Sequence, residues 1–280
     1  MAVNLASKFD TKLSNILKAE KKSSAFTNTD YSWDGVNQVI ASTLVDPTIG
    51  DYDVNGTANK YGNPTEVEDT QQTWTLVRDR SWSKTIDKKN FQDSMEIRKP
   101  GAYLAQATKN VLVPEMDTYI FQTIETAGET ASRYNLTGFT TGATTSSNAY
   151  TQFTAMTANI TDQEAPENGR VAALTAAYYN FLKQSGFILA SEAGQGKHDS
   201  GDLGTVDGVK LVVVPSSRMP SNVDLFISHP IACIAPEKLV DYTLHDNPPG
   251  VSGYLLEYRH RYDAFVDTNK TGVIAIHKTA

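Results

Sequence analysis

The chain has little of what disulfides, membrane spans and metal cages require. Its one cysteine, Cys233, lies in the apolar run 231–235, and we expect it to be a buried, small apolar side chain. A single cysteine excludes an internal disulfide and a multi-cysteine metal site. No apolar run approaches the ~18 residues that a membrane span needs. The first 22 residues lack the apolar core of a signal peptide, so we expect the chain to fold in a cytoplasm.

Motifs that carry catalysis are missing as well. No G-x-S-x-G or HExxH pattern occurs, and the five histidines have no cysteine partners. The stretch Gly194–Lys197 resembles a phosphate-binding loop but lacks its upstream glycine and the following Ser or Thr, so we expect a flexible loop over 194–201. Glu66, Glu68 and Asp69 share a polar loop, where a solvated edge is favoured over an acid–base pair. We therefore predict no enzymatic activity, no cofactor and no metal.

The charge is unevenly distributed along the chain. The net charge is −7, but residues 1–22 carry +3, which leaves −10 on the rest. An acidic body argues against a dedicated nucleic-acid reader. Residues 3–19 are predicted to form an amphipathic helix, because apolar residues recur there at helical spacing: Leu5, Phe9, Leu13, Ile16 and Leu17. A basic arm of this kind can contact phosphates or an acidic partner, although the pattern favours a solvated helix.

The most informative stretch is residues 31–127. Alternating apolar residues predict one strand over 36–45 and a second over 73–86, joined by a long polar tip around 50–63 that is rich in Gly, Asn and Asp. A two-stranded hairpin alone is marginal in water. We infer that its stability comes from another copy of the same chain, which makes assembly the central question.

The remaining pattern mixes helices with strands. A long helix is expected around 104–127, with Pro114 as its first turn or a kink and Gly128 as its end. A Ser/Thr/Gly-rich loop over 132–149 marks a boundary. Beyond these we expect helices over 90–96, 149–160 and 175–184, strands over 170–174 and 254–262, a hairpin over 205–214 that turns at Asp207–Gly208, and a terminal strand pair ending at 278. The predicted fold class is α+β.

Candidate contact residues gather in and beside the polar tip. Tyrosine offers contact area with little rotamer entropy, and arginine forks suit carboxylates across an interface. The alternative for the two arginines that flank Asp79 is an ordinary surface ion pair. The predicted inter-subunit contacts are Tyr52, Lys60, Tyr61, Trp74, Arg78, Arg80 and Trp82.

An ordered series of stretches carries a family resemblance. After the basic arm come YSWDGV, DYD…KYGNPTEVEDT, WTLVRDRSWSKTIDKKN and VLVPEMDTYIFQTI, and later HPIACIAPEKLVDYTLHDNPPGVSGYLLEYRHRYDAFV and NKTGVIAIHKTA. The series covers nearly the whole chain and resembles the major capsid proteins of tailed bacteriophages, which have the Hong Kong 97-like coat fold.

The resemblance implies a division of the chain and a function. It implies an N-terminal arm (1–30), an extended E-loop hairpin (31–90), a spine helix with peripheral domain (91–148), a mainly axial domain (149–250) and C-terminal strands that return to the peripheral domain (251–280). The implied function is a structural coat protein that self-assembles into hexamers and pentamers of an icosahedral shell enclosing double-stranded DNA.

The resemblance also implies partners. These are other copies of the chain, a separate scaffolding protein, a portal and a decoration protein, with packaged DNA touched only non-specifically and no membrane involved. The shell would assemble in the bacterial host cytoplasm and become the virion capsid. Crosslinking through Lys60, the lysine of the tip, is not expected, because no matching asparagine site is seen.

Two other classes of function stay open at this point. One is a soluble enzyme or ligand-binding domain whose pocket has no recognisable motif. The other is a ring-forming phage component, such as an adaptor or tail protein. An enzyme should show converging titratable groups, and a ring protein should assemble to one fixed size.

Overall fold

The computed structural model describes residues 21–28, 37–56, 59–93, 100–135, 143–185 and 204–279. The chain divides into two compact units. We call Tyr31–Leu76 the hairpin unit, and Met1–Asp30 together with Val77–Ala280 the body. The predicted helix over 3–19 and the predicted loop over 194–201 lie outside the described residues.

The hairpin unit contains strands β1 (Gln38–Leu44) and β2 (Asp69–Thr75), which pair antiparallel. Alternating Val, Ile and Leu residues favour the first strand, as predicted for 36–45. The predicted second strand, 73–86, is divided in the structure: β2 ends at Thr75, and a new strand, β3 (Asp79–Asp87), pairs in another sheet. The prediction of one continuous strand over 73–86 was therefore wrong.

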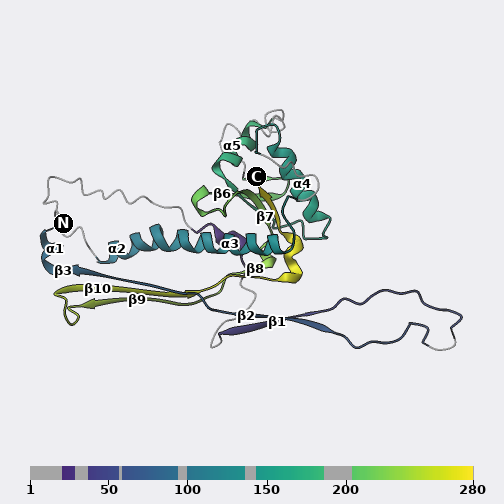
Figure 1. The fold of residues 1–280 in the computed structure, drawn as a ribbon, viewed down its shortest axis with the longest axis horizontal. Helices are drawn as coiled ribbons and strands as arrows, with labels where there is room; N and C mark the ends of the chain where they lie inside the picture. Colours follow the sequence, from purple (N-terminus) through teal and green to yellow (C-terminus); the bar gives the residue numbers. More distant parts are fainter. Residues whose placement is uncertain are drawn as a thin grey trace. The chain divides into compact units, whose positions relative to one another are not determined.

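The body contains a three-stranded antiparallel sheet in the order β3-β10-β9. Strand β9 spans Glu237–Asp246 and β10 spans Gly253–Tyr262. Buried and more exposed residues alternate along most of β10, which is the pattern of a sheet with one covered face. Aromatic side chains of the sheet lie on this side, because Trp82 contacts both Tyr258 and Tyr103 of α2. Helix α2 contacts β10 (Figure 1).

A nearly unbroken helical run follows β3 and the short helix α1 (Lys88–Asp93). It comprises α2 (Pro100–Ala107), the π-helical segment η2 (Thr108–Leu112) and α3 (Val113–Thr130). Pro114 lies in the first turn of α3. Because proline lacks an N–H and its ring crowds the carbonyl four residues earlier, it accounts for the wider π turn just before it. Of the two predicted alternatives, a first turn or a kink, Pro114 takes the first, because it lies in the first turn of α3.

Gly128 does not end this helix, contrary to our expectation. It lies buried inside α3, which continues to Thr130. A Cβ at this position would collide with the Ile276 side chain and press on Ile274. The glycine therefore permits close packing of the helix against the last strand rather than a helix stop.

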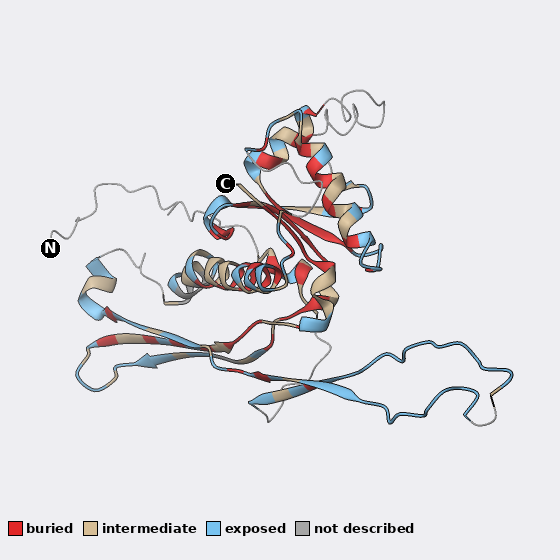
Figure 2. Cartoon of the chain, turned by 45° about the vertical axis from the view of Figure 1, so that its right-hand side comes forward, coloured by how far each residue is buried: buried red, intermediate tan, exposed pale blue. Residues whose placement is uncertain are grey.

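A five-stranded sheet forms the centre of the main core, in the order β12-β7-β4-β6-β5. Figure 2 shows its strands largely buried, whereas the hairpin unit is largely exposed. Neighbouring strands are antiparallel except β4 and β6, which are parallel. The strands are β4 (Val171–Thr175), β5 (Thr205–Val206), β6 (Val209–Val214), β7 (Val223–Ser228) and β12 (Ala275–Lys278), and helices α4 (Ala149–Thr161) and α5 (Ala176–Gln184) contact the sheet.

Several local predictions are confirmed here and one is wrong. The tight hairpin turns at Asp207 and Gly208, which both have positive φ. The predicted terminal strand pair does not form: β11 (Phe265–Val266) pairs with β8 (Cys233–Ile234), while β12 pairs with β7. The short helical turns are η1 (Ser23–Phe26), η3 (Ser216–Arg218), η4 (Pro230–Ala232) and η5 (Thr268–Val273).

Candidate functional site

The hairpin unit exposes an unusual amount of apolar surface for a polar segment. Strands β1 and β2 pair only with each other among the described residues, and the connection between them has no regular structure. Its exposed apolar side chains are Ile40, Leu44, Val45, Ile49, Tyr52, Val54, Tyr61 and Val67. Exposed apolar side chains of this kind are typical of surfaces that contact other proteins.

The same unit carries almost all of the net charge of the protein. Its sequence holds seven carboxylates and one lysine, a net charge of −6 out of −7 for the whole chain. Glu66, Glu68 and Asp69 are exposed, as expected for a solvated edge. Hydrogen bonds from Ser42 and Gln71 lower the pKa of Asp69. The hairpin unit therefore combines apolar contact groups with a strong acidic field.

Three of the predicted contact residues meet at the tip of the hairpin unit. The rings of Tyr52 and Tyr61 pack edge to face with centroids 4.9 Å apart. The Asp53 N–H donates to the Lys60 carbonyl at 3.0 Å, and the Lys60 ammonium donates to the Val54 carbonyl at 3.0 Å. These contacts hold the two sides of the tip together, and the Tyr61 side chain remains 93% exposed. A fourth predicted residue, Trp74 of β2, is buried.

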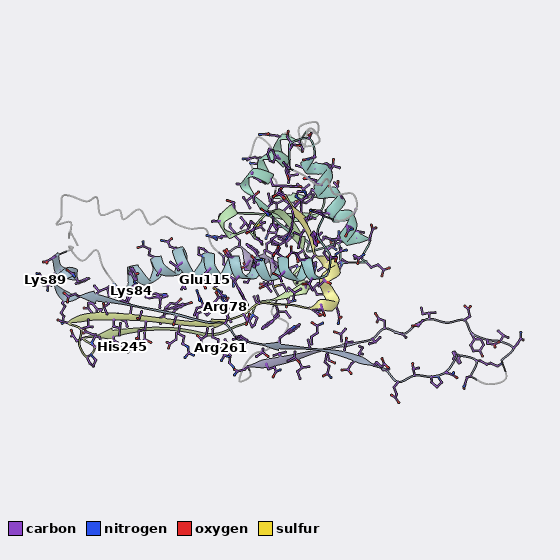
Figure 3. All side chains as sticks on the ribbon, viewed as in Figure 1. Arg78, Lys84, Lys89, Glu115, His245 and Arg261 are labelled. Atoms are coloured by element: carbon purple, nitrogen blue, oxygen red, sulfur yellow. The ribbon has the colours of Figure 1, made fainter. Side chains whose placement is uncertain are left out.

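The two predicted arginines bind within the body. The guanidinium of Arg78 donates to Glu115 at 2.7 Å and to the Tyr262 hydroxyl at 3.0 Å, and it lies 4.1 Å above the Tyr119 ring. The Arg80 Nε lies 2.6 Å from the same Glu115 oxygen. Figure 3 labels Arg78 and Glu115 at this junction of β3 and α3. The role of Arg78 and Arg80 as inter-subunit contacts stays a prediction.

Strand alternation separates Asp79 from these arginines. Its carboxylate faces the other side of the sheet, where Arg259 of β10 donates to it at 2.6 Å. The seventh predicted residue, Trp82, lies on the arginine side. Its ring stacks on Tyr258 at 5.9 Å and meets Tyr103 of α2 edge to face at 6.0 Å. Trp82 therefore helps to join the helical run to the sheet.

Asp263, a carboxylate that the sequence pattern did not single out, binds Val77, the first body residue after the hairpin unit. Asp263 accepts the Val77 N–H at 3.0 Å through one oxygen and the Tyr119 hydroxyl at 2.5 Å through the other. Burial and the Asp263 charge raise the pKa of Tyr119 to about 12. Because Val77 is fixed to Asp263, the chain leaves β2 and cannot continue in the same strand. The partners lie 186 residues apart in sequence, so no local pattern signals the contact.

A second buried carboxylate holds the base of the N-terminal segment. Asp117 of α3 accepts the backbone N–H groups of Lys22 and Ser23 at 3.1 and 3.0 Å. It also receives the Arg218 guanidinium at 2.9 Å, and both side chains of this ion pair are buried. Phe26, a few residues on, is fully buried against Phe121 and Phe226. Residues 22–26 are therefore anchored in the core.

The described residues show no arrangement typical of metal binding or membrane insertion. Within them, no group of three or more His, Cys, Asp or Glu side chains could hold a metal ion. No helix in the same ranges is both long and apolar enough to cross a membrane. Cys233 is buried, as predicted, and burial raises the pKa of its thiol to about 12.

Comparison with known proteins identifies the fold. No family model matches the sequence, and no curated protein matches it either. Among solved structures, the capsid of cyanophage P-SCSP1u matches with a TM-score of 0.73 and 12% identity, covering 100% of this chain and 92% of that chain. The chain has the fold of phage capsid proteins. This confirms the predicted fold class.

Other capsid-fold structures agree with this assignment. The mature capsid of bacteriophage PhiM1 matches with a TM-score of 0.66 and 14% identity, over 88% of this chain and 83% of that chain. A structure from Mycobacterium phage Che8 matches with a TM-score of 0.67 and 18% identity, over 90% and 89%. Since identity is this low, the shared feature is the three-dimensional arrangement rather than a sequence motif.

Proposed function

We propose that this chain is a major capsid protein, a subunit that self-assembles into the hexamers and pentamers of an icosahedral shell around double-stranded phage DNA. The observation that carries the proposal is the extent of the structural match. All of this chain aligns with 92% of a chain from a cyanophage capsid. The likeness is thus one of whole subunits, not of a small shared module.

The hairpin unit supports assembly on physical grounds. Two strands with a long, mostly exposed tip bury little apolar surface of their own. Seating Ile49, Val54 and Val67 on a neighbour would remove that surface from water, at roughly 25 cal/mol per Å². A neighbouring subunit is the partner that a shell supplies at every position.

Charge indicates which kind of contact the subunits make. Two hairpin units of net charge −6 repel each other, so a contact of hairpin with hairpin is disfavoured. Each hairpin unit must therefore meet a different surface of its neighbour. Heterologous contacts generate closed rings when the rotation between neighbours closes, and five-fold and six-fold capsomers are such rings.

The capsid fold allows the parts of the chain to be assigned roles within this proposal. The hairpin unit would be the E-loop, the run from α2 to α3 the spine helix, and the five-stranded sheet with α4 and α5 the axial domain. Because β12 belongs to that sheet, this proposal differs from the expected return of all of residues 251–280 to the peripheral domain. Residues 1–30 would be the N-terminal arm. A separate scaffolding protein, a portal and a decoration protein would be partners, and assembly would occur in the host cytoplasm.

Sedimentation of the expressed protein tests the proposal. The chain is produced with and without the neighbouring phage genes, and a variant has residues 46–68 replaced by Asn-Gly. We expect the intact chain to form fast-sedimenting particles and the shortened variant to stay as subunits that still unfold cooperatively when followed by circular dichroism. Uniform closed shells from the chain alone would remove the separate scaffolding protein from the proposal.

A matched pair of valines sharpens this test. Val67 in the hairpin unit and Val77 in the body are 75% and 76% exposed. We expect Val67→Ser to raise the critical concentration for assembly and Val77→Ser to leave it unchanged. Intact protein that remains monomeric or dimeric with every gene combination would contradict the capsid function.

A further inference from the structure

One face of the three-stranded sheet leaves an apolar strip open at β9. Tyr242 and Leu244 are 42% and 56% exposed, although they lie directly opposite Tyr258 and Leu256, which are each 3% exposed. The rings of Tyr242 and Tyr258 are 4.8 Å apart. The strip therefore continues the buried aromatic face of the sheet outward, and it is not covered by the described residues.

Lys21, in the N-terminal part of the body, contacts the sheet on this same face. The Lys21 ammonium donates to Glu237, the first residue of β9, at 2.7 Å. The other Glu237 oxygen lies 3.6 Å from the Nε2 of His260. His260 and Tyr258 are two residues apart on β10, so their side chains share one face of the sheet. Lys21, the first described residue, therefore lies at one end of the strip.

The length of residues 5–21 as a helix matches the distance from Glu237 to the end of the apolar strip on β9. Tyr242 and Leu244 lie five and seven residues beyond Glu237, or roughly 17 and 24 Å along a strand. In a helix, Phe9 and Leu5 lie 12 and 16 residues before Lys21, or roughly 18 and 24 Å. We propose that residues 3–19 dock as an amphipathic helix along β9 of their own subunit, with their apolar stripe on Tyr242 and Leu244.

Charge favours residues 3–19 over the hairpin unit of a second copy as the occupant of the strip. Residues 3–19 carry three lysines and one aspartate, a net charge of +2. The face of β9 that holds Tyr242 and Leu244 carries two carboxylates, Glu237 beside His260 and Asp246 two residues beyond Leu244, whereas Asp241 faces Arg259 on the other side. Arg259 and Arg261 alternate with Tyr258 and His260 and therefore belong to the opposite face. The hairpin unit of a second copy, at −6, would be repelled by the acidic strand.

Disulfide formation between paired cysteines tests the docking in dispersed, unassembled subunits. The test variant is Phe9→Cys with Tyr242→Cys. The matched control is Phe9→Cys with Thr243→Cys, which moves the second thiol by one residue to the other face. Native Cys233 does not compete, because it is buried and its thiol pKa is raised to about 12.

The two cysteine variants give distinguishable outcomes. We expect the test variant to form an intramolecular disulfide, seen as a faster-migrating monomer, at least about tenfold faster than the control, because docking raises the effective concentration of the two thiols. Equal rates in both variants would overturn the proposal. A disulfide-linked dimer would show that the arm of a second copy occupies the strip, which also overturns it.

Hydrogen exchange supplies a measurement that does not depend on cysteines. We expect Leu244→Asp to increase amide exchange over residues 5–19, because it places a charge in the apolar strip. Thr243→Asp, on the opposite face, should leave that exchange unchanged. Identical exchange over 5–19 in both variants and in the unmodified chain would contradict docking on β9, whether or not the protein assembles.

Discussion

The buried carboxylate of Asp117 should be the most sensitive single point in the anchoring of the N-terminal segment. It is fully buried, it accepts two backbone N–H groups from Lys22 and Ser23, and it pairs with Arg218, which is 4% exposed. Asp117→Ala would leave the Arg218 charge buried without its partner and the two N–H groups without their acceptor. The Ser23 N–H and the Arg218 guanidinium are buried, which limits how far water can replace the lost contacts.

The expected cost follows from these contacts. Removing one member of a buried ion pair typically costs about 3–5 kcal/mol. A domain of this size is stable by roughly 5–15 kcal/mol, so the loss is a large fraction of the total. At about 2–4 °C per kcal/mol, the melting temperature should fall by roughly 6–20 °C.

Urea unfolding of dispersed subunits, followed by circular dichroism, measures this loss. The control is Asp79→Ala, which removes an ion pair with Arg259 whose side chains are 34% and 59% exposed. We expect no resolvable change for the control, because exposed pairs are screened by water. If Asp117→Ala were no more destabilising than Asp79→Ala, our account of the anchor would be refuted.

Three further predictions concern other parts of the body. Arg80→Ala should lower the yield of assembled particles without changing the circular dichroism of the subunit, since the Arg80 side chain is 54% exposed. Gly128→Ala should lower the free energy of unfolding by about 1–3 kcal/mol, because its Cβ would collide with Ile276. The facing His260 imidazole and the Lys21 ammonium, which donates to Glu237 at 2.7 Å, lower the pKa of Glu237 to about 2. The stability that Glu237 contributes is therefore present above pH 4.5 and is lost as the pH falls toward 2, and Glu237→Gln should remove that part of the pH dependence.

Each of these predictions can fail in its own way. Unfolding of the Arg80→Ala subunit would show a structural role in place of a contact role. A melting temperature of Gly128→Ala equal to that of the unmodified chain would mean that α3 and β12 separate more easily than their packing indicates. Parallel stability curves for the unmodified chain and Glu237→Gln between pH 2 and 4.5 would contradict the ion pairing of Glu237.

Local sequence signals predicted the elements that depend on local contacts. The turn at Asp207–Gly208 was confirmed because its two residues tolerate positive φ. Helix α5 was confirmed, and its first turn is capped by the Thr175 hydroxyl, which accepts the Tyr178 N–H. The fold class was predicted from the ordered series of stretches that resembles phage capsid proteins, and the match to solved phage capsid structures confirmed it.

Elements decided by distant contacts were not predictable. The break between β2 and β3 depends on Asp263, and the position of Gly128 depends on Ile276, so neither can be read from neighbouring residues. The same holds for the candidate site. The sequence pattern singled out Arg78 and Arg80, and the structure shows that both bind Glu115. It could not predict this shared partner, because Glu115 lies on a helix more than 30 residues away.

Electron microscopy of the fast-sedimenting fraction tests the central claim most directly. Our account predicts closed shells with five-fold and six-fold capsomers when the chain is expressed with its neighbouring phage genes, and their loss when residues 46–68 are replaced by Asn-Gly. Flat rings of one fixed size would instead favour an adaptor or tail component. Particles that never close, or a uniform small oligomer under every condition, would contradict the capsid function.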